Sequence, residues 1–130
     1  MTVIDASAAL GLVIPDESVD DERLQDVVRG GQLHAPAIWT FECANAFTAA
    51  VRRGRMTPAV AVRAADTLLS LRVEIHQEAG PSALVQTALE SGLSAYDAAY
   101  LDLARRSGRA LLTFDRRLIG AAEAMGVELV

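Results

Sequence analysis

Lysine is absent from this chain of 130 residues, whose 12 basic side chains are all arginine. Phosphoaspartate phosphatases and receiver domains need a catalytic lysine, and such a phosphatase also needs a second acid where this chain has Ser7. The phosphate-loop motifs G-x-x-x-x-G-K and G-x-G-x-x-G are missing too. These absences exclude the usual forms of several α/β enzymes and nucleotide-binding proteins.

Cysteine is also scarce, since Cys43 is the only one. A single cysteine cannot form an internal disulfide, and Cys43 has no companion thiol or histidine at the spacing of a metal site. We therefore expect Cys43 to be a small buried residue.

Long apolar runs are lacking as well. None approaches the roughly 18 residues of a membrane span, and the first apolar stretch is interrupted by Asp5 and has no basic leader. We expect a cytoplasmic protein that does not associate with membranes. The formal charge of -5 argues against a broadly basic nucleic-acid-binding surface, so any such contact must be local. Arginine clusters at 52–55, 105–109 and 116–117 suit phosphate contacts, although a coding bias explains most of them equally well.

The length and the 52% hydrophobic content predict one globular domain over residues 1–130. Apolar periodicity and turn residues predict alternating strands and helices. The expected strands are 2–5, 33–35, 73–75, 110–113 and 127–130. The expected helices are 6–13, 24–28, 38–51, 58–71, 81–91, 94–106 and one beginning at Asp115. This alternation predicts an α/β fold with three layers, in which helices cover both faces of a parallel sheet.

Four carboxylates stand out from the 17 acidic residues because their neighbours are apolar or small: Asp5, Glu42, Asp97 and Asp115. Each has a purely structural explanation. Asp5 and Asp115 can cap the helices that follow them, Asp97 fits a capping box with Ser94, and Glu42 complements a helix dipole.

The shared apolar setting favours a further role. A buried carboxylate needs a partner, lysine is absent, and only Asp115 has an adjacent arginine. Asp5 and Asp115 also follow predicted strands, so they should face the crevice at the carboxyl ends of the sheet. A divalent cation is the simplest common partner, and oxygen ligands favour Mg²⁺ or Mn²⁺ over zinc.

Other polar residues are expected to lie outside this set. Asp102 lies about 140° around the helix from Asp97, and Asp66 is expected on a solvated helix face. His34 and His76 fall beside predicted strands, away from the acidic motifs, and we expect no catalytic role for either.

The acidic motifs together resemble those of PIN-domain nucleases, and within that family the VapC toxins of bacterial toxin-antitoxin pairs. The matching segments run in order along the whole chain: Val3 to Ser7, Glu42 with Asn45, Ser94 to Tyr100, and Leu112 to Leu118. The resemblance implies a PIN-like α/β/α sandwich in which Asp5, Glu42, Asp97 and Asp115 bind one or two Mg²⁺ or Mn²⁺ ions. It also implies supporting positions at Ser7, Asn45 and Thr113. Tyr96 and Tyr100 match the family as well, but we expect both to lie in the core.

The resemblance further implies an activity and partners. The expected reaction is hydrolysis of an RNA phosphodiester by metal-activated water, leaving a 5′-phosphate and a 3′-hydroxyl. The expected partners are a small antitoxin and a second copy of the chain, and the apolar helices between Ile38 and Leu71 also favour a homodimer. Two alternatives remain open: a PIN-like module that binds RNA or protein without cleavage, and a housekeeping RNA-processing nuclease.

Overall fold

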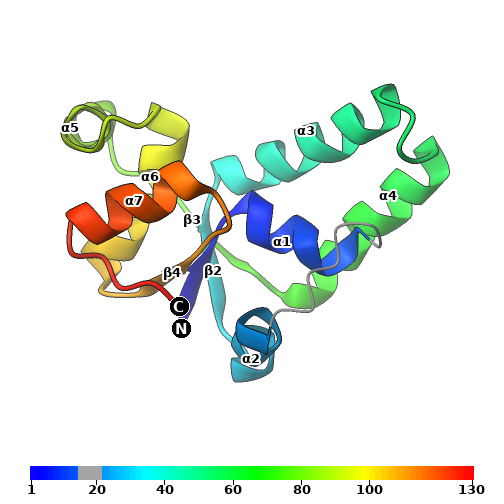
Figure 1. The fold of residues 1–130 in the computed structure, drawn as a ribbon, viewed down its shortest axis with the longest axis horizontal. Coiled ribbons are helices and arrows are strands. Elements are labelled where there is room, and N and C mark those ends of the chain that lie inside the picture. Colours follow the sequence, from blue (N-terminus) through cyan, green and yellow to red (C-terminus); the bar gives the residue numbers. More distant parts are fainter. Residues whose placement is uncertain (15–21) are drawn as a thin grey trace.

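The computed structural model describes residues 1–14 and 22–130 and has three layers (Figure 1). Its central sheet contains β1 (Thr2–Ile4), β2 (Leu33–Pro36), β3 (Glu74–His76) and β4 (Ala110–Leu112). The strand order is β3-β2-β1-β4, and every neighbouring pair is parallel. The predicted α/β class and parallel sheet are therefore confirmed.

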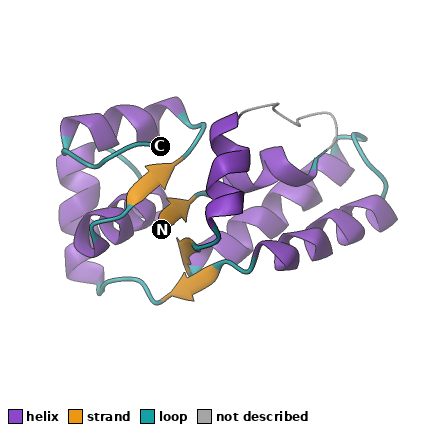
Figure 2. Ribbon diagram, turned by 90° about the horizontal axis from the view of Figure 1, so that it is seen from below, coloured by secondary structure: helices purple, strands orange, loops and turns teal. Residues whose placement is uncertain are grey.

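Helices cover both faces of the sheet. On one side lie α1 (Ala6–Val13), α3 (Ile38–Arg52) and α4 (Pro58–Thr67), and on the other lie α5 (Pro81–Ser91), α6 (Ala95–Ser107) and α7 (Arg116–Ala124). The helix α2 (Glu22–Gly30) precedes β2. Figure 2 shows the strands between the two helical groups, with the chain termini near each other. In the described part of the chain, no helix is long and apolar enough to cross a membrane.

Local sequence signals explain several helix boundaries. Thr57 accepts a hydrogen bond from the Val60 amide and so caps α4, whose first residue is proline. The glycines that close α5 and α6, Gly92 and Gly108, have positive φ angles of 71° and 65°. Glycine adopts this left-handed conformation without the steric cost that a Cβ would add.

Two predicted elements differ from the observed ones by more than one or two residues at an end. The helix expected over 58–71 is α-helical to Thr67 and continues as a 3₁₀ helix, η2 (Leu68–Leu71), before Arg72 takes a left-handed conformation. The strand expected over 127–130 is reduced to an isolated parallel bridge between Leu111 and Leu129. Pro15, expected to end the first helix, lies outside the described residues, and α1 ends at Val13.

The core is built from buried side chains of β1, β2, β4 and α6, together with apolar side chains of α1 and α3. Along α6, every side chain from Ala98 to Ala104 is buried, because this helix packs against β1, β2 and β4 as well as between α5 and α7. Cys43 is buried, as predicted. The sheet order has a consequence for function: the chain builds outward from β1 to β2 and β3, then returns to add β4 on the other side of β1. Ligands bind at such switch points, beyond the carboxyl ends of the strands.

Candidate active site

Asp5 lies at this switch point, directly after β1, and is 5% exposed. Its Oδ1 atom accepts hydrogen bonds from the Ala8 amide at 2.9 Å and from the Ser7 hydroxyl at 2.7 Å. Its Oδ2 atom accepts a hydrogen bond from the Thr113 hydroxyl at 2.5 Å. Asp5 therefore caps α1, and three donors from two parts of the chain fix the orientation of its carboxylate.

The charge on Asp5 is nevertheless poorly compensated. Burial raises the pKa of its carboxyl above the ordinary value, and the negative charge of Asp115 raises it further. The hydrogen bonds from Thr113, Ala8 and Ser7 act in the opposite direction because they stabilise the charged form, but they do not cancel the effect of burial. A cation beside Asp5 would remove this penalty.

Ser7 and Thr113 connect Asp5 to the segment that carries Asp115. The Ser7 hydroxyl oxygen accepts a hydrogen bond from the Phe114 amide at 3.0 Å, and the Thr113 hydroxyl oxygen accepts one from the Asp115 amide at 3.0 Å. The structure thus brings both residues against Asp5. Each hydroxyl contacts a carboxylate oxygen and a backbone amide, so both are already oriented.

Glu42 comes from α3, on the other side of the sheet from α6. It is half-buried, and one carboxylate oxygen accepts a short hydrogen bond from the hydroxyl of Tyr100 on α6. Burial raises the pKa of the Glu42 carboxyl, the Tyr100 hydrogen bond lowers it, and the negative charges of Asp97 and Asp5 raise it again. Burial of the Tyr100 side chain raises the pKa of its hydroxyl, and the Glu42 carboxylate raises it further. Glu42 therefore shares an electrostatic site with Asp97 and Asp5.

Asp97 and Asp115 lie at helix starts, as their sequence context predicted. The Ser94 hydroxyl accepts a hydrogen bond from the Asp97 amide at 3.2 Å, so Ser94 caps α6. Oδ1 of Asp115 accepts hydrogen bonds from the amides of Arg117 and Leu118 at 2.9 and 3.2 Å and caps α7. Both amides use the same oxygen of Asp115. Capping thus engages a single oxygen of this exposed carboxylate.

The carboxylates of the four acids do not form a compact cluster of ligand atoms. In residues 1–14 and 22–130, only one group of three metal-ligating side chains has its ligand atoms within 4.8 Å of one another, and it contains none of these acids. Their donor set consists of carboxylate oxygens alone, which fits Mg²⁺ or Mn²⁺. The mutual repulsion that raises the pKa of Asp5 and Glu42 also fits a site that receives a cation.

Other residues singled out in the sequence have different surroundings. Asn45 is exposed on α3, one turn after Glu42, and makes no hydrogen bond to the four acids within the described residues. Asp102 is buried and pairs with Arg106 at 3.0 Å, while Asp66 is exposed on α4. The expectation that Tyr96 lies in the core is wrong, because its side chain is 63% exposed. It lines an apolar hollow with Phe41 and Leu84, whereas Tyr100, one turn later, is buried.

Two features of the site escaped the sequence analysis. Tyr100 was expected only to fill the core, but it donates to Glu42. Its spacing of three residues from Asp97 places it on the same side of the helix, which is a signal that sequence alone offers. Glu78 accepts a hydrogen bond from the Ile38 amide at 2.7 Å and so caps the start of α3 from 40 residues away. No local pattern indicates such a contact.

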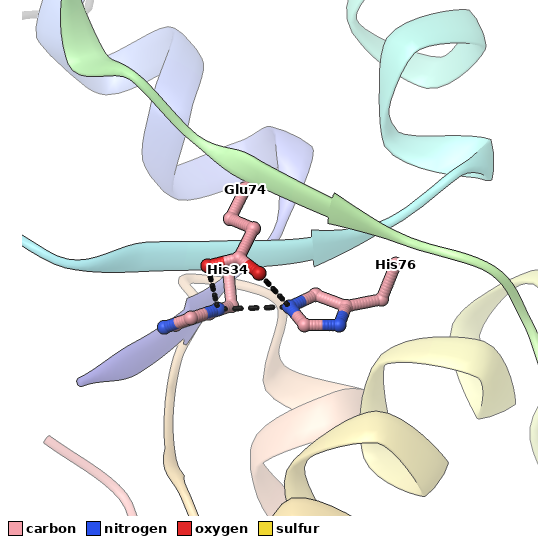
Figure 3. A group of neighbouring side chains, drawn as sticks. All are labelled: His34, Glu74 and His76. Atoms are coloured by element: carbon pink, nitrogen blue, oxygen red, sulfur yellow. Dashed lines mark hydrogen bonds and ion pairs between the residues drawn. The ribbon is translucent and has the colours of Figure 1, made fainter.

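The histidines form a second cluster that was not predicted. His34 on β2 and His76 on β3 lie with Glu74 on one face of the sheet (Figure 3). Burial and the positive charge of Arg109 lower the pKa of His34. Within the described residues, neither histidine forms a hydrogen bond or ion pair with the four acids. This cluster is therefore separate from the acidic site.

Comparison with known proteins gives a consistent family match. The family model described as PIN domain matches residues 2–124. Ribonuclease VapC3 of Pyrobaculum aerophilum is 33% identical over 120 residues, which cover 89% of this chain and 90% of that protein. Ribonuclease VapC9 of Mycobacterium tuberculosis is 32% identical over 124 residues, which cover 95% and 93% of the two chains.

Solved structures agree with these sequence matches. A crystal structure of a Pyrobaculum aerophilum protein superposes with a TM-score of 0.75 at 27% identity, covering 92% of this chain and 78% of that one. Mycobacterium tuberculosis VapC20, a toxin that cleaves the sarcin-ricin loop, superposes with a TM-score of 0.63. That match covers 100% and 98% of the two chains at 20% identity, so it supports the fold alone.

Proposed function

Because this chain belongs to the PIN-domain family, we propose that it is a Mg²⁺- or Mn²⁺-dependent endoribonuclease whose site contains Asp5, Glu42, Asp97 and Asp115. The observation that carries the proposal is the position of Asp5. It is a buried carboxylate at the switch point of a parallel sheet, oriented by three hydrogen-bond donors and facing the negative charges of other acids. A fold gains no stability from such repulsion, so a bound cation explains it better than capping does.

The residues of this chain would hold the ion and orient the substrate around it. A bound Mg²⁺ or Mn²⁺ supplies the Lewis acidity that activates water and stabilises negative charge on the phosphodiester. Asp5 provides the fixed ligand, since Ser7 and Thr113 hold its carboxylate in one orientation. Tyr100 holds Glu42 from the opposite helix. Asp97 and Asp115 complete the set from the starts of α6 and α7. Asn45, one turn after Glu42 on α3, is exposed, so its supporting role rests on the family resemblance alone.

We further propose that the chain is the toxin of a toxin-antitoxin pair and acts in the cytoplasm on RNA. Its relatives VapC3 and VapC9 carry the name ribonuclease and match almost the full length of the chain. A toxin of this kind requires a small antitoxin as its partner. The net charge of -5 disfavours broad contacts with RNA, so we expect the substrate contacts to be local.

The proposal includes a homodimer. The surface between α3 and α4 has an apolar groove lined by Phe47, Val51, Pro58, Ala61 and Val62, and Val62 is 63% exposed. Apolar grooves of this kind mark protein interfaces. Sedimentation of the purified chain at micromolar concentration should give twice the mass of 13.8 kDa, and a monomer would contradict this part of the proposal.

The activity is tested with the purified chain and structured RNA. Cleavage should require Mg²⁺ or Mn²⁺, stop in excess chelator, and leave 5′-phosphate ends. Asp5→Asn should abolish it, whereas Asp66→Asn on the exposed face of α4 should leave it unchanged. Full cleavage in chelator would contradict the metal mechanism. RNA binding without cleavage under all metal conditions would instead indicate the binding-module alternative.

The biological role requires a separate experiment. Expression of the wild-type chain without its partner should arrest growth, and expression of Asp97→Asn should not. Active enzyme that leaves growth unaffected would contradict the toxin assignment and favour a housekeeping nuclease.

A further inference from the structure

The two histidines of this chain meet across neighbouring strands. The sequence has only two, and Nδ1 of His34 lies 2.8 Å from Nε2 of His76 although 42 residues separate them. The register of the parallel pair β2 and β3 places His34 opposite Glu74 and Pro36 opposite His76. Because side chains alternate along a strand, His34, Glu74 and His76 point to the same face of the sheet (Figure 3).

We propose that His34, Glu74 and His76 form a binding site for a transition-metal ion of the Zn²⁺ type, separate from the acidic site. The three side chains offer two imidazole nitrogens and a carboxylate, and one ligand atom from each lies within 4.8 Å of the others. Imidazole favours Zn²⁺, Ni²⁺ and Cu²⁺, whereas Mg²⁺ prefers oxygen ligands. The two sites therefore select different metals.

The distances fit one ion between the three groups. Zinc binds nitrogen and oxygen at about 2.0–2.2 Å, so the ligand atoms of a tetrahedral site lie roughly 3.3–3.6 Å apart. Here the nitrogens are 2.8 Å apart, and the Glu74 oxygens lie 3.6 Å from Nδ1 of His34 and 3.9 Å from Nε2 of His76. Small side-chain rotations bring these separations to the required values. The exposed side of Glu74 leaves the fourth position open to water.

The burial of the three side chains fits a metal ligand set. His34 is 2% exposed, so its ring is held in place by the core, while His76 is partly exposed and Glu74 mostly exposed. Arg109 and the N-terminal amino group place positive charge near His34, and the carboxylate of Glu74 counteracts only part of it. One fixed and two adjustable ligands allow an ion to enter from solvent.

A metal ion bound at this site would stabilise the edge of the sheet. Among the described residues, strand β3 pairs with β2 alone, and an ion shared by His34 and the two β3 residues would link both strands. Just beyond the site, the His76 carbonyl accepts a hydrogen bond from the Ala37 amide, and Glu78 caps α3. Metal binding should therefore stabilise the edge strand and the start of the helix that carries Glu42.

The test measures Zn²⁺ binding by calorimetry, with the untagged full chain in excess Mg²⁺. The wild type should bind one Zn²⁺, and its melting temperature should rise. His76→Gln should lose at least about tenfold in Zn²⁺ affinity, since even residues behind a metal ligand contribute about 10–100-fold. Glu74→Gln should weaken binding in the same way. Glu123→Gln removes an exposed charge on α7 and should bind Zn²⁺ like the wild type.

Two further measurements separate this site from the acidic one. Asp97→Asn should retain Zn²⁺ binding. Nitrogen chemical shifts of the two histidines should report Zn²⁺ on Nδ1 of His34 and Nε2 of His76. The spectrum of His76→Gln assigns both rings, because the chain has no other histidine. No saturable Zn²⁺ binding, or unchanged affinity in His76→Gln, would overturn the proposal. None of these readouts depends on RNA cleavage, so the result is independent of the proposed function.

Discussion

Thr113 donates a hydrogen bond to Asp5 across 108 residues of sequence, with the two oxygens 2.5 Å apart. The contact exists because β1 and β4 are paired in parallel, which brings the residues after both strands to the same edge of the sheet. Thr113 also accepts a hydrogen bond from the Asp115 amide. A single hydroxyl therefore links the first acid of the chain to the segment that carries the last one.

Thr113→Val should reduce metal-dependent RNA cleavage by removing this link. The change preserves the shape of the side chain but leaves Oδ2 of the buried Asp5 without its closest donor. Losing a hydrogen bond to a buried charged group costs roughly 1.5–3 kcal/mol. Thr113→Ser keeps the hydroxyl and should retain most of the activity. Equal activity in the valine and serine variants, measured as kcat/KM, would contradict a positioning role for Thr113.

Tyr100→Phe should destabilise the protein and weaken the proposed metal site. Tyr100 is 1% exposed and its hydroxyl contacts the half-buried Glu42, so the substitution removes the only hydrogen-bond donor that the described residues give that carboxylate. We expect a loss of about 1–3 kcal/mol in the free energy of unfolding. Tyr96→Phe is the matched control, because Tyr96 is 63% exposed. Denaturant unfolding of both variants distinguishes the two tyrosines, and equal losses would show that the Glu42 contact contributes nothing.

Asp97→Asn should stabilise the metal-free protein and reduce the stabilisation by Mg²⁺ or Mn²⁺. The substitution removes a negative charge that faces Glu42, while the cap of α6 remains, because Ser94 accepts from the backbone amide of residue 97. At metal concentrations of roughly 100 times Kd, the wild type should gain about 2.7 kcal/mol. Thermal melts with and without metal measure both effects.

Asp66→Asn is the control for these melts, since Asp66 is an exposed acid on α4. It should leave the melting temperature and the metal shift unchanged. If Asp97→Asn instead lowered the stability of the metal-free protein and kept the full metal shift, Asp97 would have only a structural role.

Glu42→Gln should raise the stability of the metal-free protein at pH 7 but not near pH 4. Burial and the charges of Asp97 and Asp5 raise the pKa of Glu42 in the folded state above its ordinary value of 4.5. The stability contributed by the neutral carboxyl is therefore complete below pH 4.5 and is lost as the pH rises through the higher folded-state pKa. Glutamine stays neutral and can still accept the Tyr100 hydrogen bond.

This pH dependence is best measured as the difference between variant and wild type in chelator. His34 also titrates with a lowered pKa, and its effect has the opposite sign, because the unfolded state binds that proton more tightly. The difference between Glu42→Gln and wild type cancels this contribution. A constant difference between pH 4 and pH 7 would contradict the role of Glu42 charge, and Glu123→Gln on the exposed face of α7 should show no such trend.

Much of the fold follows from local sequence features. Thr57 and Pro58 mark the start of α4, and Gly92 and Gly108 close α5 and α6. Short apolar or alternating runs mark the four strands. These signals act within a few residues, through capping, backbone conformation and apolar periodicity. The prediction of a fifth strand over 127–130 is wrong because an apolar run carries no information about the strand with which it must pair. Within that run, Leu129 alone forms a bridge, to Leu111.

The candidate acids could also be identified in the sequence, because each carboxylate stands among apolar neighbours at a strand end or helix start. Their contacts in space could not be predicted from the sequence. Strand pairing decides that Thr113 meets Asp5, the packing of α3 and α6 decides that Tyr100 meets Glu42, and the register of β2 and β3 decides that His34 meets His76. A one-residue shift of that register would turn His76 to the other face of the sheet. The sequence thus determined which side chains are available and where each helix and strand begins. The tertiary structure decided which of these side chains contact one another, because contacts between distant segments form only when the whole core is buried together.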